Sequence, residues 1–370
     1  MKKKKYTFID LFAGIGGFHT AMHSVGGKCV FASEWDKYAR ASYEANYVGV
    51  EPSLFKKDKN GRYLFFNEDI NDIMPSTVPN FDICCGGFPC QPFSTAGLKR
   101  GFEDTRGTLF FNIANLVKEK IDAGYPPRVL FLENVRGLKN HDNGKTLQVI
   151  LATLEELGYR CSYEVLNAKY FGVPQNRERL FIIAWYKKLV DVDFFSFPYG
   201  IAENGDTIYN KNDLKKGTVK TKVSDVFEPS SITTLYTISD KMWEGHKARK
   251  ERNKMNGKGF GYSLFNGESV YTSTISARYW KDGSEILIDQ SDKNLNPRTL
   301  TPVEAGRLQG YRIIGNGWEY PECENNQNYN ESNIEFNIVV SKKEAYRQFG
   351  NSVAIPVIKR LAEEIIKQLM

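Results

Sequence analysis

The chain has 370 residues, of which 41% are hydrophobic and 25% are charged, so it is long enough to bury a large core. It contains no apolar run of the ~18 residues that span a membrane, and no signal-type apolar stretch follows the basic start MKKKK, which leads us to expect a cytoplasmic protein without membrane contact. A formal net charge of +6 favours an anionic partner but does not identify one.

The six cysteines are scattered along the chain and include no CxxC pair and no His/Cys cluster. This distribution argues against both a disulfide framework and a zinc site. We therefore expect reduced thiols and no structural metal.

The first 185 residues alternate short strand-like runs with amphipathic, helix-like stretches. This alternation predicts βαβ units on an open, mostly parallel sheet. The predicted strands cover residues 6–12, 28–33, 81–85, 128–133, 159–167 and 179–185, and the clearest helices cover 107–124 and 144–158.

The first predicted strand ends in a glycine turn, AGIGGF, and a helix-like stretch follows from Phe18. Glycines let the backbone approach a ligand, and a helix start offers free amide groups. The turn departs from G-x-G-x-x-G because His19 stands three residues after Gly16, which favours S-adenosylmethionine over a dinucleotide such as NAD. The alternative is a tight connection that binds nothing.

Acidic residues end the next two predicted runs. Glu34 lies twenty residues after Gly14, at the end of the second strand, where an acidic side chain would meet ribose hydroxyls. Asp69 and Ile70 follow another short apolar run. They could contact the adenine edge, or Asp69 could simply cap a helix.

The stretch GGFPCQPFS places Cys90 between two prolines, just after a predicted strand. A stiff loop at the carboxyl end of a strand is a suitable place for a nucleophile. A free thiol has a pKa near 8.5, so a nearby cation would be needed to increase the thiolate fraction. Arg177 and Arg179 are candidates for that cation. The alternative is a small loop residue without a chemical role.

The run FLENV ends a predicted strand at Glu133. A partly desolvated carboxyl group there could share a proton with a ring nitrogen, whereas the alternative is a strand-end glutamate in water. Cys84 and Cys85, which lie inside the preceding strand, are expected to be packed in the core.

From about residue 188 the chain becomes polar and rich in Gly, Asn and Lys. Between Lys241 and Lys258 it carries seven Lys or Arg against two Glu, which would either neutralise phosphates or form a solvated helix face. Arg278, Tyr279 and Lys281 are predicted on a strand and turn from which they could reach base edges. The last sixteen residues predict an amphipathic helix that docks on the N-terminal sheet.

Seven blocks of this sequence, in this order, strongly resemble the DNA (cytosine-5)-methyltransferases. They are DLFAGIGGF (10–18), GGFPCQPFS (86–94), RGTLF (106–110), ENV (133–135), QNRER (175–179), RTLTPVEAGRLQG (298–310) and QFGNSVA (348–354). The resemblance implies a Rossmann-like, S-adenosylmethionine-dependent methyltransferase sheet with a smaller, mostly irregular or β target-recognition domain. It implies a catalytic domain in 1–187, the recognition domain in 188–312, a variable loop in 313–344 and a segment in 345–370 that returns to the catalytic domain.

The resemblance also implies roles for individual residues. Cys90 would add to C6 of a flipped-out cytosine, Glu133 would engage N3, and Arg177 and Arg179 would brace both. From their position near Cys90 in the sequence, and not from the resemblance, we expect Gln91, Ser94 and Arg106 to hold the flipped nucleotide or its phosphates. The positions that would line S-adenosylmethionine, and its product S-adenosylhomocysteine, are Phe12, Ala13, Gly14, Gly16, Gly17, Phe18, Glu34, Trp35, Asp69, Ile70, Pro89, Leu109, Asn351 and Ser352.

The expected partner is a specific site in double-stranded DNA, methylated by a monomer that protects host DNA from a cognate restriction endonuclease. One alternative is a tRNA cytosine-5 methyltransferase on the same scaffold, although the long basic insert favours DNA. Another is a DNA-binding protein that has the fold without the reaction, although Cys90 and Glu133 are both present. An NAD-dependent oxidoreductase disagrees with the glycine spacing.

Overall fold

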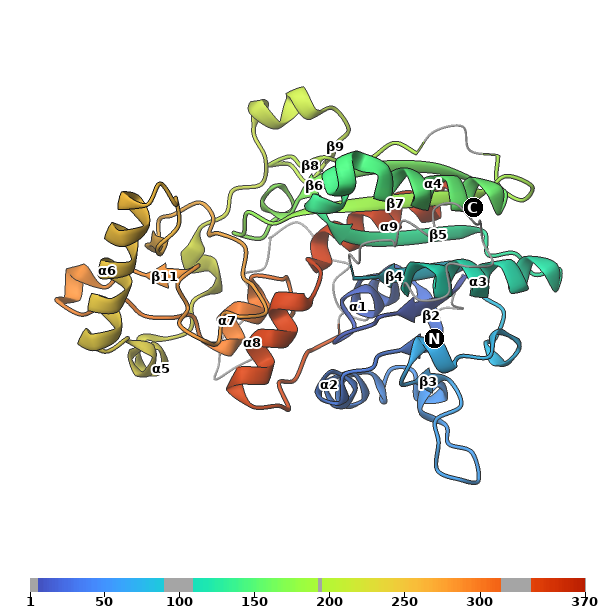
Figure 1. Ribbon diagram of the computed structural model, residues 1–370, viewed down its shortest axis with the longest axis horizontal. Coiled ribbons are helices and arrows are strands. Elements are labelled where there is room, and N and C mark those ends of the chain that lie inside the picture. The colour runs from blue at the N-terminus through green and yellow to red at the C-terminus, as the bar shows by residue number, and fades with distance from the viewer. Residues whose placement is uncertain (1–5, 90–108, 192–194, 314–333, 370) are drawn as a thin grey trace. The chain divides into compact units, whose positions relative to one another are not determined.

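A seven-stranded sheet organises the N-terminal half of the chain in the computed structural model, which describes residues 6–89, 109–191, 195–313 and 334–369 (Figure 1). The strand order is β3-β2-β1-β4-β5-β7-β6. The strands are β1 (Tyr6–Leu11), β2 (Gly27–Ser33), β3 (Phe66–Asn67), β4 (Ile83–Gly87), β5 (Val129–Val135), β6 (Tyr159–Asn167) and β7 (Glu178–Tyr186).

The pairs among β3, β2, β1, β4 and β5 are all parallel, and β7 pairs antiparallel with β5. The prediction of a mostly parallel α/β sheet is therefore confirmed. Strand order reverses between β1 and β4, because the chain runs outward to β3 before it crosses to the other side of β1. Ligands of open α/β sheets bind at such a reversal, beside the carboxyl ends of the two strands.

Helices cover both faces of this sheet. Helices α3 (Leu109–Asp122) and α4 (Lys145–Glu156) share one core with alternate residues of β4, β5 and β7. On the other face Phe18 of α1 (Gly17–Ser24) packs edge-on against Phe131 of β5, with ring centroids 5.0 Å apart. A further helix, α2 (Lys37–Tyr47), follows β2 and was not predicted.

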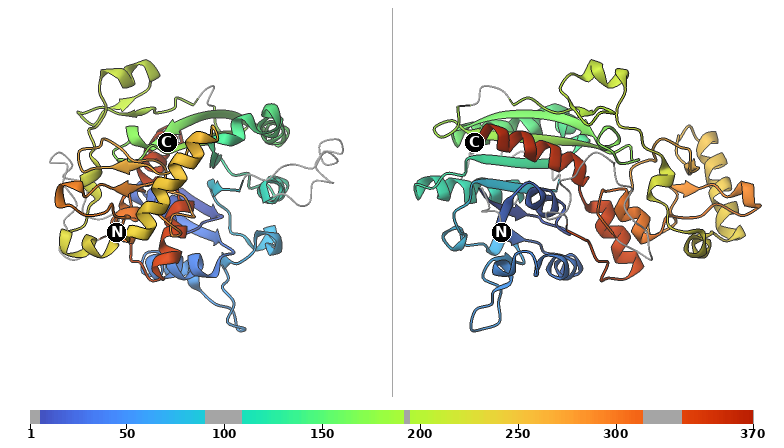
Figure 2. Two further views of the ribbon diagram at one scale, coloured as in Figure 1. Left: turned by 60° about the vertical axis from the view of Figure 1, so that its left-hand side comes forward. Right: turned by 180° about the vertical axis from the view of Figure 1, so that it is seen from behind.

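The last helix, α9 (Ile355–Leu369), runs beside the sheet strands and lies in front of them when the molecule is seen from behind (Figure 2, right). Ile358, Leu361 and Ile365 of its apolar stripe are fully buried. The guanidinium group of Arg128 donates to the carbonyl of Leu369 over 2.9 Å, which ties the end of α9 to the start of β5.

The chain divides into two compact units. Unit 1 consists of Met1–Leu166, Glu178–Pro198 and Ile358–Met370, and unit 2 of Asn167–Arg177 and Tyr199–Val357. Residues 167–177 thus lie in unit 2 and not with the rest of the predicted catalytic domain. The side-chain oxygen of Gln175 accepts the amide of Ile275, and its side-chain amide donates to the carbonyl of Leu308. Residues 345–357 also belong to unit 2, so only the part from Ile358 onward returns to the sheet.

The described residues of unit 2 have little regular structure. Its strands form a parallel pair, β10 (Leu264–Phe265) with β11 (Leu287–Ile288), and an antiparallel pair, β8 (Gly200–Ile201) with β9 (Thr207–Ile208). Its α-helices are α5 (Ser230–Thr233), α6 (Asp240–Met255), α7 (Pro302–Arg307) and α8 (Lys342–Asn351). The 3₁₀ helices within the described ranges of both units are Pro52–Phe55, Ile70–Asp72, Pro75–Thr77, Arg136–Gly144, Ala168–Tyr170, Lys211–Lys216, Val223–Val226, Thr234–Tyr236 and Ser291–Lys293.

A buried ion pair anchors unit 2. Arg298 reaches both carboxylate oxygens of Glu304 at 2.7 and 3.0 Å, and both side chains are almost completely buried. Glu304 also forms a capping box with Thr301 at the start of α7. Such a pair is stable only where the geometry satisfies both charges, as it does here. The RTLTPVEAGRLQG block is thus explained by packing and capping within unit 2.

No helix in the described part of the chain is long and apolar enough to cross a membrane. The same residues contain no group of three or more His, Cys, Asp or Glu side chains that could hold a metal ion.

Candidate active site

The glycine turn after β1 is a strained loop held against the end of β2. Phe12, Gly14 and Gly16 all have positive φ values, of 55°, 56° and 82°. For a phenylalanine this conformation is uncommon and costs energy that the surroundings must offset. The amide of Ala13 donates to the carbonyl of Ser33 over 2.9 Å, which fixes the loop to β2.

Glu34 closes this loop from the end of β2. One carboxylate oxygen accepts the amide of Gly14 and the other accepts the amide of Asp36, each over 2.8 Å. Burial raises the pKa of Glu34, and the two amide hydrogen bonds oppose that rise. Trp35, the next residue, exposes 77% of its surface.

These groups fit the nucleoside half of S-adenosylmethionine. Each carboxylate oxygen of Glu34 has lone-pair capacity beyond its one amide bond, which two ribose hydroxyls could use. The exposed indole ring of Trp35 offers a flat apolar face on which an adenine could stack.

Asp69 and Ile70 lie after β3 at the start of a 3₁₀ helix. Asp69 accepts the backbone amide and the side-chain amide of Asn71 over 2.9 and 2.7 Å, so the cap that the sequence allowed is present. Ile70 is nearly buried, Pro89 is exposed and Leu109 lies half-buried at the start of α3. Their contacts with a cofactor remain predictions.

The ends of β4 and β5 lie level with each other, because Gly87 and Glu133 are partners in the parallel register. A Cβ atom at position 87 would lie 3.3 Å from Oε2 of Glu133, so glycine leaves room for the carboxylate. Cys90 follows Gly87 by three residues but lies outside the described residues, as do Gln91, Ser94 and Arg106.

Asn134 holds the backbone at Phe88, which precedes Cys90 by two residues in the sequence. Its side-chain amide donates to the carbonyl of Phe88 over 2.7 Å, and both residues are buried. Its side-chain oxygen accepts the amide of Val135 over 2.8 Å, which fixes the orientation of the side chain. No separate role was predicted for Asn134, although it directly follows Glu133 in the sequence.

Glu133 and Arg179 form an ion pair at this edge of the sheet. Nε of Arg179 lies 3.0 Å from Oε1 of Glu133, and Glu133 is only 8% exposed. Arg179 is opposite Val135 on the antiparallel strand, which puts its side chain on the same face as Glu133. Burial lowers the pKa of Arg179, and the charge of Glu133 opposes that effect. The structure thus brings together two of the predicted catalytic residues.

Arg177 has different partners. It belongs to unit 2, where its buried guanidinium group donates to the carbonyls of Ile275, Gly350 and Ser352. These bonds connect the QNRER segment to the QFGNSVA segment. The guanidinium group is therefore a brace within unit 2. Its role beside the flipped base and the carboxylate remains a prediction.

The QFGNSVA segment is itself tightly placed within unit 2. A Cβ atom at Gly350 would lie 2.3 Å from the backbone of residues 276 and 277, so only glycine permits this approach. The hydroxyl groups of Ser352 and Tyr311 are 2.7 Å apart, and Asn351 is exposed. The cofactor roles predicted for Asn351 and Ser352 remain predictions.

The residues predicted to read DNA differ in exposure. Arg278 and Lys281 are exposed in a turn, not on a strand. Tyr279, however, is 1% exposed, and its hydroxyl group donates to the carbonyl of Ile286 and accepts the amide of Leu300. Its predicted contact with a base is therefore wrong for this conformation, since the ring belongs to the core of unit 2.

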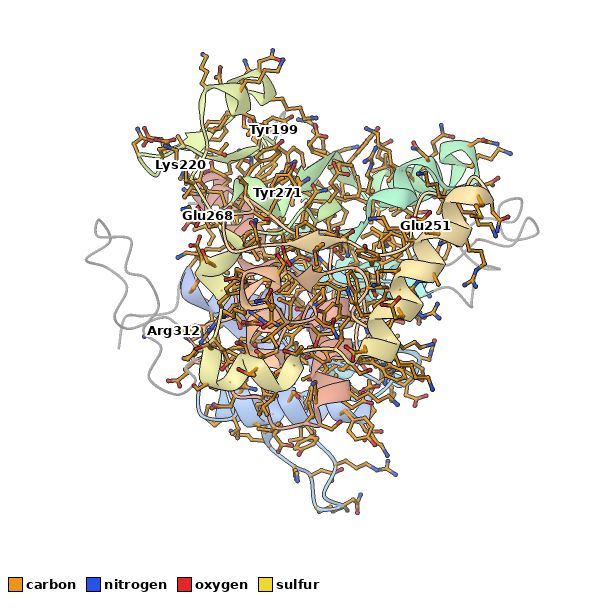
Figure 3. The ribbon with its side chains drawn as sticks, turned by 90° about the vertical axis from the view of Figure 1, so that its left-hand side faces the viewer. Tyr199, Lys220, Glu251, Glu268, Tyr271 and Arg312 are labelled. Atoms are coloured by element: carbon orange, nitrogen blue, oxygen red, sulfur yellow. The ribbon has the colours of Figure 1, made fainter. Side chains whose placement is uncertain are left out.

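The basic run forms α6, whose side chains project from the helix in Figure 3, where Glu251 marks its second half. Arg249 is held by Asp282 at 2.7 Å, whereas Lys241, Lys250, Arg252 and Lys254 are exposed. This arrangement gives one helix a concentration of accessible positive charge. Such a surface can neutralise nucleic-acid phosphates.

Comparison with known proteins identifies close relatives along the whole chain. A family model described as C-5 cytosine-specific DNA methylase matches residues 6–367. The chain is 46% identical over 370 residues to the type II methyltransferase M1.ScrFI of Lactococcus lactis subsp. cremoris, covering 100% of this chain and 80% of that protein. It is also 46% identical over 364 residues to the type II methyltransferase M.NlaX of Neisseria lactamica, covering 97% and 96%.

Solved structures resemble the fold at much lower identity. A Spodoptera frugiperda DNMT2 mutant aligns with a TM-score of 0.67 and 18% identity, covering 98% of this chain and 100% of that one. A putative DNA modification methyltransferase encoded within an E. coli prophage aligns with a TM-score of 0.61 and 19% identity, covering 99% of both chains. At these identities the likeness establishes the fold alone.

Proposed function

The chain belongs to the C-5 cytosine-specific DNA methylase family, and we propose that it transfers a methyl group from S-adenosylmethionine to C5 of a cytosine in a specific double-stranded DNA site. The observation that carries the proposal is the ion pair between Glu133 and Arg179. Glu133 lies opposite Gly87, which precedes Cys90 by three residues in the chain. The methyl donor, when bound, supplies an electrophilic methyl group on sulfur.

Cytosine C5 is a poor nucleophile, and the residues at this edge of the sheet are suited to activating it. The Cys90 thiolate adds to C6 while Glu133 holds a proton at N3, so that the electron pair of the C5–C6 double bond becomes available at C5. C5 then takes the methyl group. Loss of the C5 proton, expulsion of the Cys90 thiolate and return of the N3 proton to Glu133 restore the aromatic ring and the free enzyme.

The carboxyl group needs a fixed direction for this step. The bond from Nε of Arg179 holds one oxygen of Glu133, and the neighbouring Gly87 leaves room beside the other. Because C6 is hidden in a stacked duplex, the target base must be flipped out, at a cost of a few kcal/mol. The exposed cations of α6 would contribute salt-dependent binding to the phosphates.

We further infer a type II modification role, because relatives that align along nearly the whole chain are named type II methyltransferases. In this role a monomer would act on a short DNA site in the cytoplasm and protect it from a partner endonuclease. The basic helix within a unit of more than 150 residues favours duplex DNA over tRNA as the substrate.

Bisulfite sequencing of a plasmid from cells that express the protein tests the reaction. We expect protected cytosines at one recurrent site with the wild-type protein and with Cys161→Ser, which removes a half-buried thiol from β6. Cys90→Ser should give none. Protection that persists in Cys90→Ser would overturn the mechanism.

A second assay distinguishes DNA from RNA and catalysis from binding alone. With S-adenosylmethionine present, the purified protein should form a covalent adduct through Cys90 with duplex DNA that carries 5-fluorocytosine at the mapped site. The fluorine atom replaces the C5 hydrogen and cannot leave as a cation, so the thiolate is not expelled. Transfer of labelled methyl groups to tRNA but not to DNA would establish the RNA alternative. Binding of DNA without an adduct or methyl transfer would establish the non-catalytic one.

A further inference from the structure

A buried group of aromatic side chains lies behind the glycine loop in unit 1. Tyr43 and Tyr47 come from α2 and His19 comes from α1, and all three are fully buried. The His19 ring stacks on Tyr47 with centroids 4.1 Å apart and an interplanar angle of 14°. Nδ1 of His19 lies 2.7 Å from the hydroxyl group of Tyr43. This group explains why a histidine replaces the last glycine of the dinucleotide pattern, since its ring fills the space between α1 and α2.

Tyr47 contacts the backbone of the loop itself. Its hydroxyl oxygen lies 2.7 Å from the carbonyl of Gly16 and 3.1 Å from that of Ile15. It also lies 2.7 Å from the hydroxyl group of Thr20 in α1. A Cβ atom at Gly16 would lie 2.3 Å from the Tyr47 ring, so the glycine at this position is matched to the tyrosine.

Helix α2 therefore contributes to holding the glycine loop at both of the helix's ends. Its N-cap residue is Asp36, whose backbone amide donates to Glu34, and Glu34 in turn accepts the amide of Gly14. It ends at Tyr47, which contacts the carbonyls at the far end of the same loop. A loop with three positive-φ residues has other accessible conformations, and bonds at both ends reduce their population.

We propose that the Tyr47 hydroxyl group is a positioning group for the methyl donor: it holds the glycine loop in the conformation that receives S-adenosylmethionine. This inference rests on the proposed function, in which the loop binds that molecule. Without the hydroxyl group the binding-competent fraction of the loop falls, and the apparent affinity falls by the same factor. Tyr47 does not touch the reacting atoms, so the rate at saturation is unaffected.

The test is Tyr47→Phe, which removes one oxygen atom and keeps the ring that packs against Gly16 and His19. Tyr63→Phe is the matched control, because the Tyr63 hydroxyl group donates to Glu44 of the same helix over 2.6 Å, away from the loop. The dissociation constant of S-adenosylmethionine is measured by calorimetry, its KM and kcat by methyl transfer to DNA, and the fold by melting temperature.

We expect Tyr47→Phe to raise both the dissociation constant and the KM for S-adenosylmethionine by roughly tenfold, with kcat within about twofold of wild type. Tyr63→Phe should leave all three constants at their wild-type values. A folded Tyr47→Phe protein with wild-type affinity, or with a lower kcat and an unchanged KM, overturns the inference and leaves the proposed function intact. A wild-type protein that binds no S-adenosylmethionine overturns both.

Discussion

Asn134 is predicted to control the reactivity of Cys90 without touching the base. Its side-chain amide is bonded to the carbonyl of Phe88, two residues before the nucleophile, in a place where both residues are buried. Asn134→Ala leaves that carbonyl without this donor and away from water. An unsatisfied buried group of this kind costs about 1–3 kcal/mol.

The same magnitude sets the expected loss of rate. If the bond holds the Cys90 loop in the reactive conformation, a loss of about 1–3 kcal/mol slows covalent addition by roughly 5- to 150-fold. Asn134→Asp should be at least as slow, because it replaces the donor by an oxygen that repels the Phe88 carbonyl. The assay is the rate of adduct formation with 5-fluorocytosine DNA at saturating S-adenosylmethionine.

Asn112→Ala provides the control. It removes a 2.8 Å hydrogen bond to Asn71 on the surface of the same unit, so its adduct rate should match that of wild type. An Asn134→Ala protein that forms the adduct at the wild-type rate would refute the reasoning, since the tether would then have no effect on the nucleophile.

Three further predictions follow from the described contacts. Arg179→Lys keeps a positive charge but loses the directed Nε bond to Glu133. The kcat, measured by methyl transfer, should therefore fall at least tenfold (about 1.4 kcal/mol), whereas the DNA affinity, measured by titration, should change little. Burial raises the pKa of Glu34 above its ordinary value of 4.5, and ribose hydroxyls favour the ionised carboxylate. The affinity for S-adenosylmethionine should therefore be full above the raised pKa and should fall as the pH drops through it. In calorimetry, Glu34→Gln should bind S-adenosylmethionine weakly at every pH, without this dependence. Glu304→Gln leaves Arg298 buried without its counter-charge and should destabilise unit 2 by about 3–5 kcal/mol, seen as a lower urea midpoint for the tryptophan signal.

The sheet and its ligand edge could be predicted because their signals are local. Strand β5 is buried on both faces, so its first four residues, VLFL, form a continuous apolar run. The glycines after β1 and at the end of β4 mark the neighbouring turns directly. The strands of the sheet other than β3 were predicted within a few residues of their bounds. Helix α2 was missed because its buried face consists of tyrosines and small polar residues rather than aliphatic ones.

Other parts of the site depend on contacts between residues far apart in the chain, which no spacing rule reveals. The two arginines of QNRER are separated by one residue, yet Arg179 bonds Glu133 in unit 1 and Arg177 bonds backbone carbonyls in unit 2. Tyrosine is a residue type that can contact bases, and only the two buried hydrogen bonds of Tyr279 show that it is part of the core. Residue type alone could not separate these roles, because an arginine or a tyrosine is equally suited to both.

The glycine loop shows why some residues without any chemical role are nevertheless tightly constrained. Its backbone conformation is unfavourable at Phe12, and the energy that offsets this strain comes from bonds that the loop makes with β2 and α2. Glu34 supplies one of these bonds and is also the predicted partner of the ribose, so a change at this residue affects both binding and loop geometry. Tyr47 supplies another and is expected to affect only geometry. Comparing the two substitutions therefore separates the direct contribution of a ligand contact from the cost of holding the loop ready for it.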